Sequence, residues 1–174
     1  MVIKCLSAER DWQVLKLVLA KVPSVLQNKA ILSQYGTALQ GFVDPLLELT
    51  KSNSMYPECL TNIQQDKFSR SEFQNHVYPV IAAMAPYNEY LESTTTRALI
   101  NSLQNGLLSR ECTRICIVAL TACALEMRKS MYAKIPEVLL NFTKISPTKP
   151  IATPMLEFLS TLIRLPDIFS SFTD

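Results

Sequence analysis

Residues 110–128 read RECTRICIVALTACALEMR, and this stretch decides the fold class. Apolar residues fill most of its interior, and Thr113, Arg114 and Thr121 form only a thin polar stripe. A helix that is apolar nearly all round is buried on most of its sides. The alanines within the stretch would also let neighbouring helices approach closely. The sequence therefore predicts a central helix that is surrounded by other helices.

Prolines divide the rest of the chain into further helices. Proline is tolerated at the first position of a helix, because the N–H that it lacks would have no partner there. Six of the ten prolines stand directly before, or one residue before, a pair of apolar residues, which is the pattern expected at a helix start. They are Pro23, Pro45, Pro79, Pro136, Pro154 and Pro166. Five of them predict helix starts, with Asp44 and Thr153 as N-caps. Pro79 is expected inside a helix that begins after the capping box Ser69-Arg70-Ser71-Glu72.

The expected helices are joined mostly by short connections. They cover 8–21, 24–34, 37–51 with a break near Pro45, 70–85, 93–107, 110–128, 131–144, 154–164 and 166–172. Only the connections near 52–69 and 145–153 are long. Short connections make successive helices antiparallel neighbours, and such pairs continued along a chain build an α-solenoid. Because the proline spacing is irregular, we expect residues 1–174 to form one all-α solenoid segment of degenerate, HEAT-like antiparallel helix pairs.

The composition predicts a helical chain whose surface is partly covered. There are 3 Gly, and no Asn-Gly or Asp-Gly hairpin signal occurs. Charged residues make up 18% of the chain and the mean hydropathy is +0.14, whereas a typical soluble domain has about 25% charged residues. This balance favours a subunit or a piece of something longer. It also predicts self-association through solenoid ends that lack polar caps.

Hydropathy and charge argue against two classes of protein. The longest near-apolar run, 115–125, is shorter than the roughly 18–20 residues that a membrane-spanning helix needs, so the chain is not expected to be transmembrane. The net charge is +2 and the longest basic tract is Arg128-Lys129. The basic stripe expected of a nucleic-acid-binding protein is therefore missing.

Few residues have the chemistry of a catalytic or metal site. The five cysteines form no Cys-x-x-Cys pair and His76 is the only histidine, which argues against a disulfide framework and a zinc site and favours a reducing cytosol. Cys112, Cys116 and Cys123 share one helix face. They form either a redox or soft-metal site or part of the core, and the core is favoured because free cysteine is usually buried. We predict no catalytic residue, no cofactor and no metal.

The two long connections have a functional and a structural interpretation each. Ser146-Pro147-Thr148-Lys149 is similar to a proline-directed kinase site, although an ordinary loop between helices is the simpler interpretation. The polar connection near 52–69 is either a mobile linker or a binding loop.

One polar stripe runs along the expected helix 154–164. Glu157, Ser160, Thr161 and Arg164 follow helical spacing, so they form a solvated face, a polar seam between repeats or the floor of a concave groove. Arg164 falls in the last turn, where a cation complements the helix dipole. Our hypothesis is that Arg164 clamps the corner to the next helix through Asp167 and, at longer reach, Glu157.

Three stretches resemble the tuberin family. They are residues 10–19, which read RDWQVLKLVL, then Phe68-Ser69-Arg70 with the following Val80-Ile81, and residues 156–162, which read LEFLSTL and continue to Arg164-Leu165-Pro166. The resemblance runs along most of the chain and is weakest across 20–66. These are packing motifs, and their common order along the chain makes the resemblance specific.

The resemblance implies a tumour-suppressor protein that is large and cytosolic, lies partly at the lysosomal surface, and has a long HEAT-like solenoid and a distant GTPase-activating domain. In this family the protein associates with hamartin, and the complex stimulates GTP hydrolysis by the small GTPase Rheb and so restrains TOR signalling. The present chain would be an interior scaffold segment. Rheb would be contacted only through the absent domain, which holds the catalytic asparagine, so no catalytic residue carries over.

Two other functions stay open at this point. One is a HEAT-type adaptor of another pathway, such as trafficking, or the solenoid of a Ral GTPase-activating α subunit. The other is a small all-α enzyme that uses a cysteine, which would require His76 to contact that cysteine.

Overall fold

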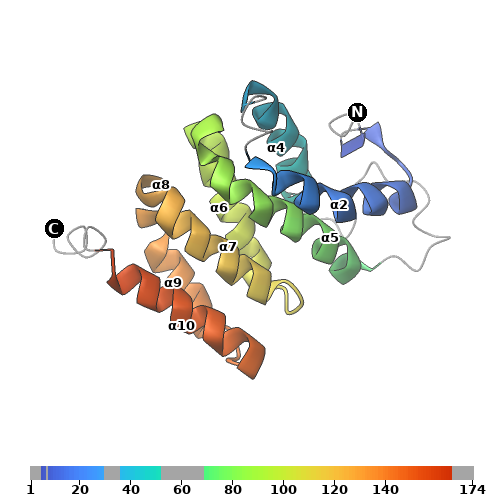
Figure 1. The fold of residues 1–174 in the computed structure, drawn as a ribbon. Helices are drawn as coiled ribbons and strands as arrows, with labels where there is room; N and C mark the ends of the chain where they lie inside the picture. Colours follow the sequence, from blue (N-terminus) through green and yellow to red (C-terminus); the bar gives the residue numbers. More distant parts are fainter. Residues whose placement is uncertain (1–4, 7, 30–35, 52–68, 166–174) are drawn as a thin grey trace.

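The structure, a computed structural model, describes residues 5–6, 8–29, 36–51 and 69–165 (Figure 1). Every regular element within these residues is helical, and they contain no strand. The prediction of an all-α fold is therefore confirmed. The expected helix 166–172 and the connection near 52–69 lie almost entirely outside the described residues.

Eight α-helices and one 3₁₀ helix follow one another in the described residues. They are α2 (Trp12–Leu26), α4 (Gly36–Lys51), α5 (Arg70–Met84), the 3₁₀ helix η2 (Ala85–Tyr90), α6 (Ser93–Leu107), α7 (Thr113–Glu126), α8 (Arg128–Tyr132), α9 (Ile135–Thr143) and α10 (Lys149–Ile163). The predicted helices 70–85 and 93–107 agree with α5 and α6 to within one residue. The predicted helix 131–144 is divided, since α8 ends at Tyr132 and α9 begins at Ile135.

Only some of the helix starts that were predicted from prolines agree with the structure. Pro136 stands at the start of α9 and Pro79 lies inside α5, as predicted. Pro23, Pro45 and Pro154 are also inside helices, so the predicted helix starts at these three positions are wrong. A proline inside a helix costs about 3 kcal/mol. Burial of large apolar side chains beyond the proline, at about 1.5–3 kcal/mol each, offsets that cost. These side chains include Leu26 in α2, Leu46 and Leu47 in α4, and Phe158 and Leu162 in α10.

The start of α10 shows what replaced the expected signal. The helix begins at Lys149 and not at Pro154, and Pro150 lies in its first turn, where the missing N–H has no cost. Thr148, which precedes it, has extended backbone with φ −70° and ψ 154°. Thr153 therefore lies inside α10 and is not an N-cap.

Side-chain caps fix the starts of two helices. Asp11 caps α2, because its Oδ1 accepts hydrogen bonds from the backbone N–H groups of Gln13 at 2.8 Å and Val14 at 3.3 Å. Ser69 caps α5 by accepting from the Glu72 N–H at 3.1 Å, as the capping box predicted. Asp44 is not a cap, since it lies inside α4.

The helices pack in two rows with α7 at the centre. Helices α2, α5, α7 and α10 contact one another in that order, while α4 packs against α6 and α6 against α8 and α9 (Figure 1). Contacts of α6 with both α5 and α7 join the rows, and α7 also contacts η2 and α8. The central position predicted for the apolar stretch 110–128 is therefore confirmed.

The polar stripe predicted on α7 is partly wrong. Thr113 is 2% exposed, and its hydroxyl donates to the carbonyl oxygens of Leu107 at 3.0 Å and Ser109 at 2.9 Å. Arg114 is exposed and Thr121 is half-buried. The buried threonine is satisfied because it closes the turn that connects α6 to α7.

Candidate functional site

The predicted polar stripe lies on the outer side of α10. Glu157 and Arg164 are exposed, Thr161 is half-buried, and the Thr161 hydroxyl donates to the Glu157 carbonyl oxygen at 2.8 Å. Arg164 is the C-cap residue of the helix. Asp167 lies outside the described residues, and within them no ion pair joins Glu157 to Arg164. The contact of Arg164 with Asp167 therefore stays a prediction.

An apolar ridge beside this stripe was not foreseen. Leu156, Leu159 and Ile163 occur about one turn apart on α10 and are 66%, 37% and 70% exposed. The opposite face of α10 supplies the core contacts, where the rings of Phe158 and Phe142 meet edge to face at 5.1 Å. A helix with a single apolar face would bury that face in the core and expose no such ridge. Helix α10 therefore has two apolar faces, and the described residues cover only one of them.

Two other helices also expose large apolar side chains. Leu17 and Val25 on α2, and Val118 and Leu125 on α7, are between 48% and 67% exposed. Monomeric proteins tolerate single exposed apolar residues, but runs of them at helical spacing are typical of contact surfaces. The low content of charged residues in the sequence indicates such an apolar surface, but it does not show which helix faces are exposed.

The three cysteines that share a helix face lie in the core. Cys112, Cys116 and Cys123 are at most 1% exposed. Burial raises the pKa of Cys112 to about 11 and of Cys123 to about 12, and it raises the pKa of Cys116 as well. The thiolate is the reactive form of cysteine, so these shifts oppose nucleophilic and redox chemistry.

His76 belongs to the contact between α2 and α5. Its Nδ1 is 2.8 Å from the Glu72 carbonyl oxygen, and its ring meets that of Trp12 edge to face at 5.9 Å. Lys16 on α2 forms an ion pair with the Glu72 carboxylate on α5, and the Trp12 ring also contacts Phe73 at 5.7 Å. In the described part of the chain no hydrogen bond joins His76 to a cysteine, so the arrangement supports packing and not nucleophile activation.

A polar seam joins α4 to α6. The Gln40 side-chain N–H donates to Thr95 Oγ1 at 2.6 Å and to Asp44 Oδ1 at 3.0 Å, and the Thr95 hydroxyl donates to Asp44 Oδ1 at 3.3 Å. Further along, the Ser102 hydroxyl donates to Thr50 Oγ1 at 2.9 Å. These bonds fix the register of the two helices, and they satisfy the Asp44 carboxylate inside α4.

Metal binding and membrane insertion find no support in the described residues. No cluster of three or more His, Cys, Asp or Glu side chains there has the arrangement to hold a metal ion. None of the described helices combines the length and the apolar character that crossing a membrane requires.

Comparison with known proteins shows which family contains this chain. A family profile described as Tuberin matches residues 1–174, the whole chain. The chain belongs to the tuberin family. It is also similar to the Tuberous sclerosis 2 protein homolog of Schizosaccharomyces pombe (strain 972 / ATCC 24843), with 21% identity over 173 residues. That alignment covers 98% of this chain but 12% of the relative, so the chain spans about an eighth of the relative's length.

The tuberin-family stretches have both structural and surface roles. Residues 10–19 form the capped start of α2 and bring Trp12, Leu15 and Leu19 into the core. Residues 156–162 bring Phe158 and Leu162 into the core, but they also place Leu156 and Leu159 on the exposed ridge. The tuberin resemblance therefore extends to residues that do not stabilise the described core.

Proposed function

We propose that this chain is a non-catalytic scaffold segment of a tuberin-like protein that, with hamartin, stimulates GTP hydrolysis by Rheb and restrains TOR signalling. The observation that carries the proposal is the tuberin-family match across the entire chain. It favours this function over an adaptor of another pathway and over the solenoid of a Ral GTPase-activating α subunit. The parent protein would be cytoplasmic and partly at the lysosomal surface.

We further propose that the helices form a HEAT-like solenoid segment. The support is the order of contacts, in which α2, α5, α7 and α10 pack consecutively while α4, α6 and α9 lie on the other side (Figure 1). Each repeat of a solenoid contacts only its neighbours, so its terminal faces stay apolar until another repeat covers them. The exposed ridge on α10 has this character.

Exposed apolar end faces should make the isolated chain self-associate. Sedimentation velocity over a concentration series is expected to show dimers or larger species as the concentration rises. Ile163→Asp, which places a charge on the α10 ridge, should reduce this association. A chain that stays monomeric at millimolar concentration would contradict the proposal of uncovered solenoid ends.

The scaffold function predicts that this chain does not activate Rheb by itself. Stimulating GTP hydrolysis requires a polar or basic group positioned at the transferring phosphate. In the tuberin family that group is an asparagine of the GTPase-activating domain, and no residue of this chain matches it. A single-turnover GTPase assay of Rheb should give the same rate with and without the purified chain. A saturable acceleration would overturn the proposal.

Hamartin binding separates the scaffold function from a generic adaptor. A coiled-coil fragment of hamartin on beads should capture the chain, whereas an unrelated coiled coil of similar charge should not. Failure of capture under conditions in which full-length tuberin binds would favour the adaptor.

Two matched variants would then locate the hamartin contact. Ile163 on α10 and Leu17 on α2 are 70% and 67% exposed, so aspartate at either position should leave the core intact. Weaker capture of only Ile163→Asp would place the contact on the α10 ridge. Weaker capture of only Leu17→Asp would place it on α2.

A further inference from the structure

A hollow lies where two connections of the array meet. The connection from α6 to α7 forms one side, and the connection from α9 to α10 with the first turn of α10 forms the other. Its volume is about 750 Å³, and its polar lining includes Arg110, Glu111, Arg114, Lys144, Ser146 and Thr148. No residue of the α10 stripe or the α10 ridge contributes to it.

Three cations line this hollow against one carboxylate. Arg110, Arg114 and Lys144 carry positive charge, and Glu111 is the only acidic lining residue. Among the described residues no carboxylate forms an ion pair with either arginine, and the Lys144 ammonium donates only to the Asn141 side chain at 3.3 Å. All three side chains are exposed, and their like charges would attract an anion that binds in the hollow.

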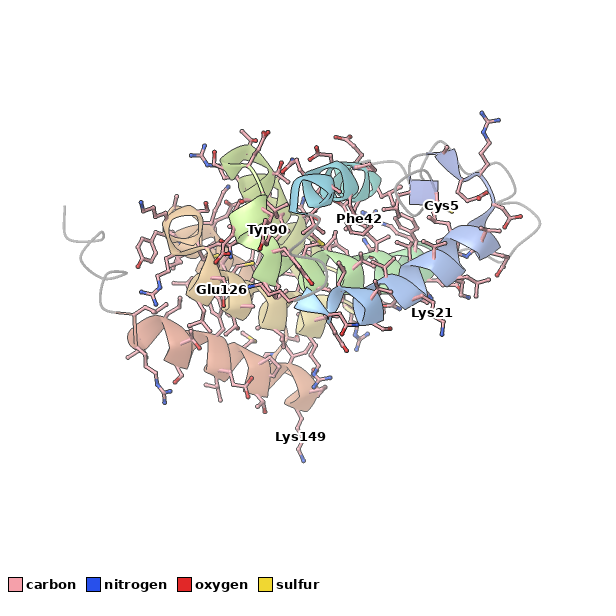
Figure 2. All side chains as sticks on the ribbon, turned by 45° about the horizontal axis from the view of Figure 1, so that its top comes forward. Cys5, Lys21, Phe42, Tyr90, Glu126 and Lys149 are labelled. Atoms are coloured by element: carbon pink, nitrogen blue, oxygen red, sulfur yellow. The ribbon has the colours of Figure 1, made fainter. Side chains whose placement is uncertain are left out.

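The hollow also contains a phosphorylatable hydroxyl in a suitable conformation. Ser146 is exposed and non-helical, and it stands directly before Pro147, which favours extended backbone at the preceding residue. The Thr148 N–H donates to the Ser146 carbonyl oxygen at 2.8 Å and so turns the chain tightly around the proline. Lys149 follows at the third position after the serine, and Figure 2 shows it extending into solvent from the first turn of α10.

We propose that a proline-directed serine/threonine kinase phosphorylates Ser146, and that Arg110, Arg114 and Lys144 bind the resulting phosphate within the same chain. In the transfer, Ser146 Oγ bonds to the γ-phosphorus of ATP, the bond from that phosphorus to the bridging oxygen of ADP breaks, and the hydroxyl proton passes to the kinase's catalytic base. ADP leaves and phosphoserine remains.

The phosphate would tie the two connections together. It carries about −1.5 to −2 charges at pH 7 and three strong acceptor oxygens. Guanidinium groups bind such oxygens through short, charge-assisted hydrogen bonds, often in pairs. Because Arg110 and Arg114 flank the start of α7 while Ser146 precedes α10, the bonds would brace α10 against α7. Phosphorylation would thereby restrain the helix that carries the exposed apolar ridge.

The first test measures phosphate incorporation into the folded chain. A panel of purified proline-directed kinases with ATP should add one phosphate, located at Ser146 by peptide mass spectrometry. Ser146→Ala should abolish incorporation, whereas Thr148→Ala, which changes the other hydroxyl of the motif, should leave it intact. The control is a chain that has been unfolded in urea and prevented from refolding. The proposed site is refuted if the kinases phosphorylate Ser146 in this unfolded chain but leave the folded chain unmodified.

The second test measures whether the cations hold the phosphate. The second pKa of phosphoserine is about 6, and cations in contact with it should lower that value by about 1 unit or more. A ³¹P NMR titration of the phosphorylated chain should show this shift. Arg110→Gln and Arg114→Gln should each restore part of it. Arg97→Gln, which removes an exposed arginine of α6 outside the hollow, should leave it unchanged.

Two outcomes would overturn the binding of the phosphate within the chain. One is a phosphoserine pKa equal to that of a short phosphopeptide. The other is a shift that disappears on dilution, since contacts between molecules depend on concentration and contacts within one chain do not.

Discussion

Replacing Gly106 by alanine should destabilise this protein, because α6 passes too close to its neighbours for a side chain at that position. A Cβ on residue 106 would lie 2.5 Å from Cys116 Sγ and 2.6 Å from Tyr78 Cε1. Carbon atoms in favourable contact are about 3.5–4.0 Å apart. Cys116 and Tyr78 are 0% and 4% exposed, so neither can move into solvent. The added methyl group on α6 would therefore clash with side chains of both α5 and α7. The three helices meet near the centre of Figure 1.

The expected loss in the free energy of unfolding is the difference between two opposing effects. Adding atoms to a filled core costs about 1–3 kcal/mol, and two contacts far below normal separation place Gly106→Ala near the upper end. Alanine stabilises a helix relative to glycine by at most about 1 kcal/mol, and by less in the last turn, where Gly106 lies. The expected net loss is about 2 kcal/mol. For a chain of this size the melting temperature should fall by about 4–8 °C.

Gly41→Ala is the matched control, because it makes the same chemical change where nothing is in the way. Gly41 lies inside α4, and a Cβ there would meet no atom within 4 Å. Helix propensity alone predicts a gain of about 0.5–1 kcal/mol. Urea unfolding followed by circular dichroism at 222 nm would measure both variants beside the parent.

A double variant tests the cause of the loss. Cys116→Ala removes the sulfur atom nearest to the new methyl group, so Gly106→Ala should cost less in that background, with a coupling energy of about 1 kcal/mol. The reasoning fails if Gly106→Ala unfolds at the same urea concentration as the parent. It also fails if the two substitutions are strictly additive.

Three further predictions concern other helices. The three buried cysteines of the α7 face should react with a thiol reagent at pH 8 only on unfolding, since burial raises each pKa and keeps the thiol protonated, whereas the half-buried Cys5 should react earlier. Tyr87→Phe should cost about 1–2 kcal/mol in urea unfolding, because the Tyr87 hydroxyl donates to the buried Leu26 carbonyl at the end of α2; an unchanged midpoint would show that water replaces it. Arg164→Gln should lower stability by about 0.3–1 kcal/mol, because the exposed guanidinium complements the α10 C-terminus, while a loss above 2 kcal/mol would indicate the buried clamp to Asp167.

Local sequence signals predicted those features that depend on near neighbours in the chain. Ser69 and Glu72 gave the start of α5 because an N-cap involves only one turn of helix. The same locality explains the failure at Pro23, Pro45 and Pro154. The proline pattern predicts a helix start at each position, because proline fits there, but burial against other helices stabilises a helix that continues through it.

The candidate surfaces were less predictable than the helices. Periodicity identified Glu157, Thr161 and Arg164 as one stripe, and the structure does place this stripe on the outside of α10. Periodicity does not separate the exposed apolar residues Leu156, Leu159 and Ile163 from Phe158 and Leu162, which are buried. Which apolar face of a helix is covered depends on where the next helix packs, and a pattern within α10 contains no information about that.

The sequence by itself determined the all-α class, the central position of α7 and the family, because each depends on residue order or on apolar content along one helix. Only the tertiary structure distinguished the glycines and brought the cations together. Gly41 and Gly106 are alike in sequence context, but one faces open space and the other faces Cys116 and Tyr78. Arg110 and Lys144 are far apart along the chain and line one hollow because α6, α7, α9 and α10 pack their connections together. Contacts between distant residues arise from packing, which no local pattern encodes.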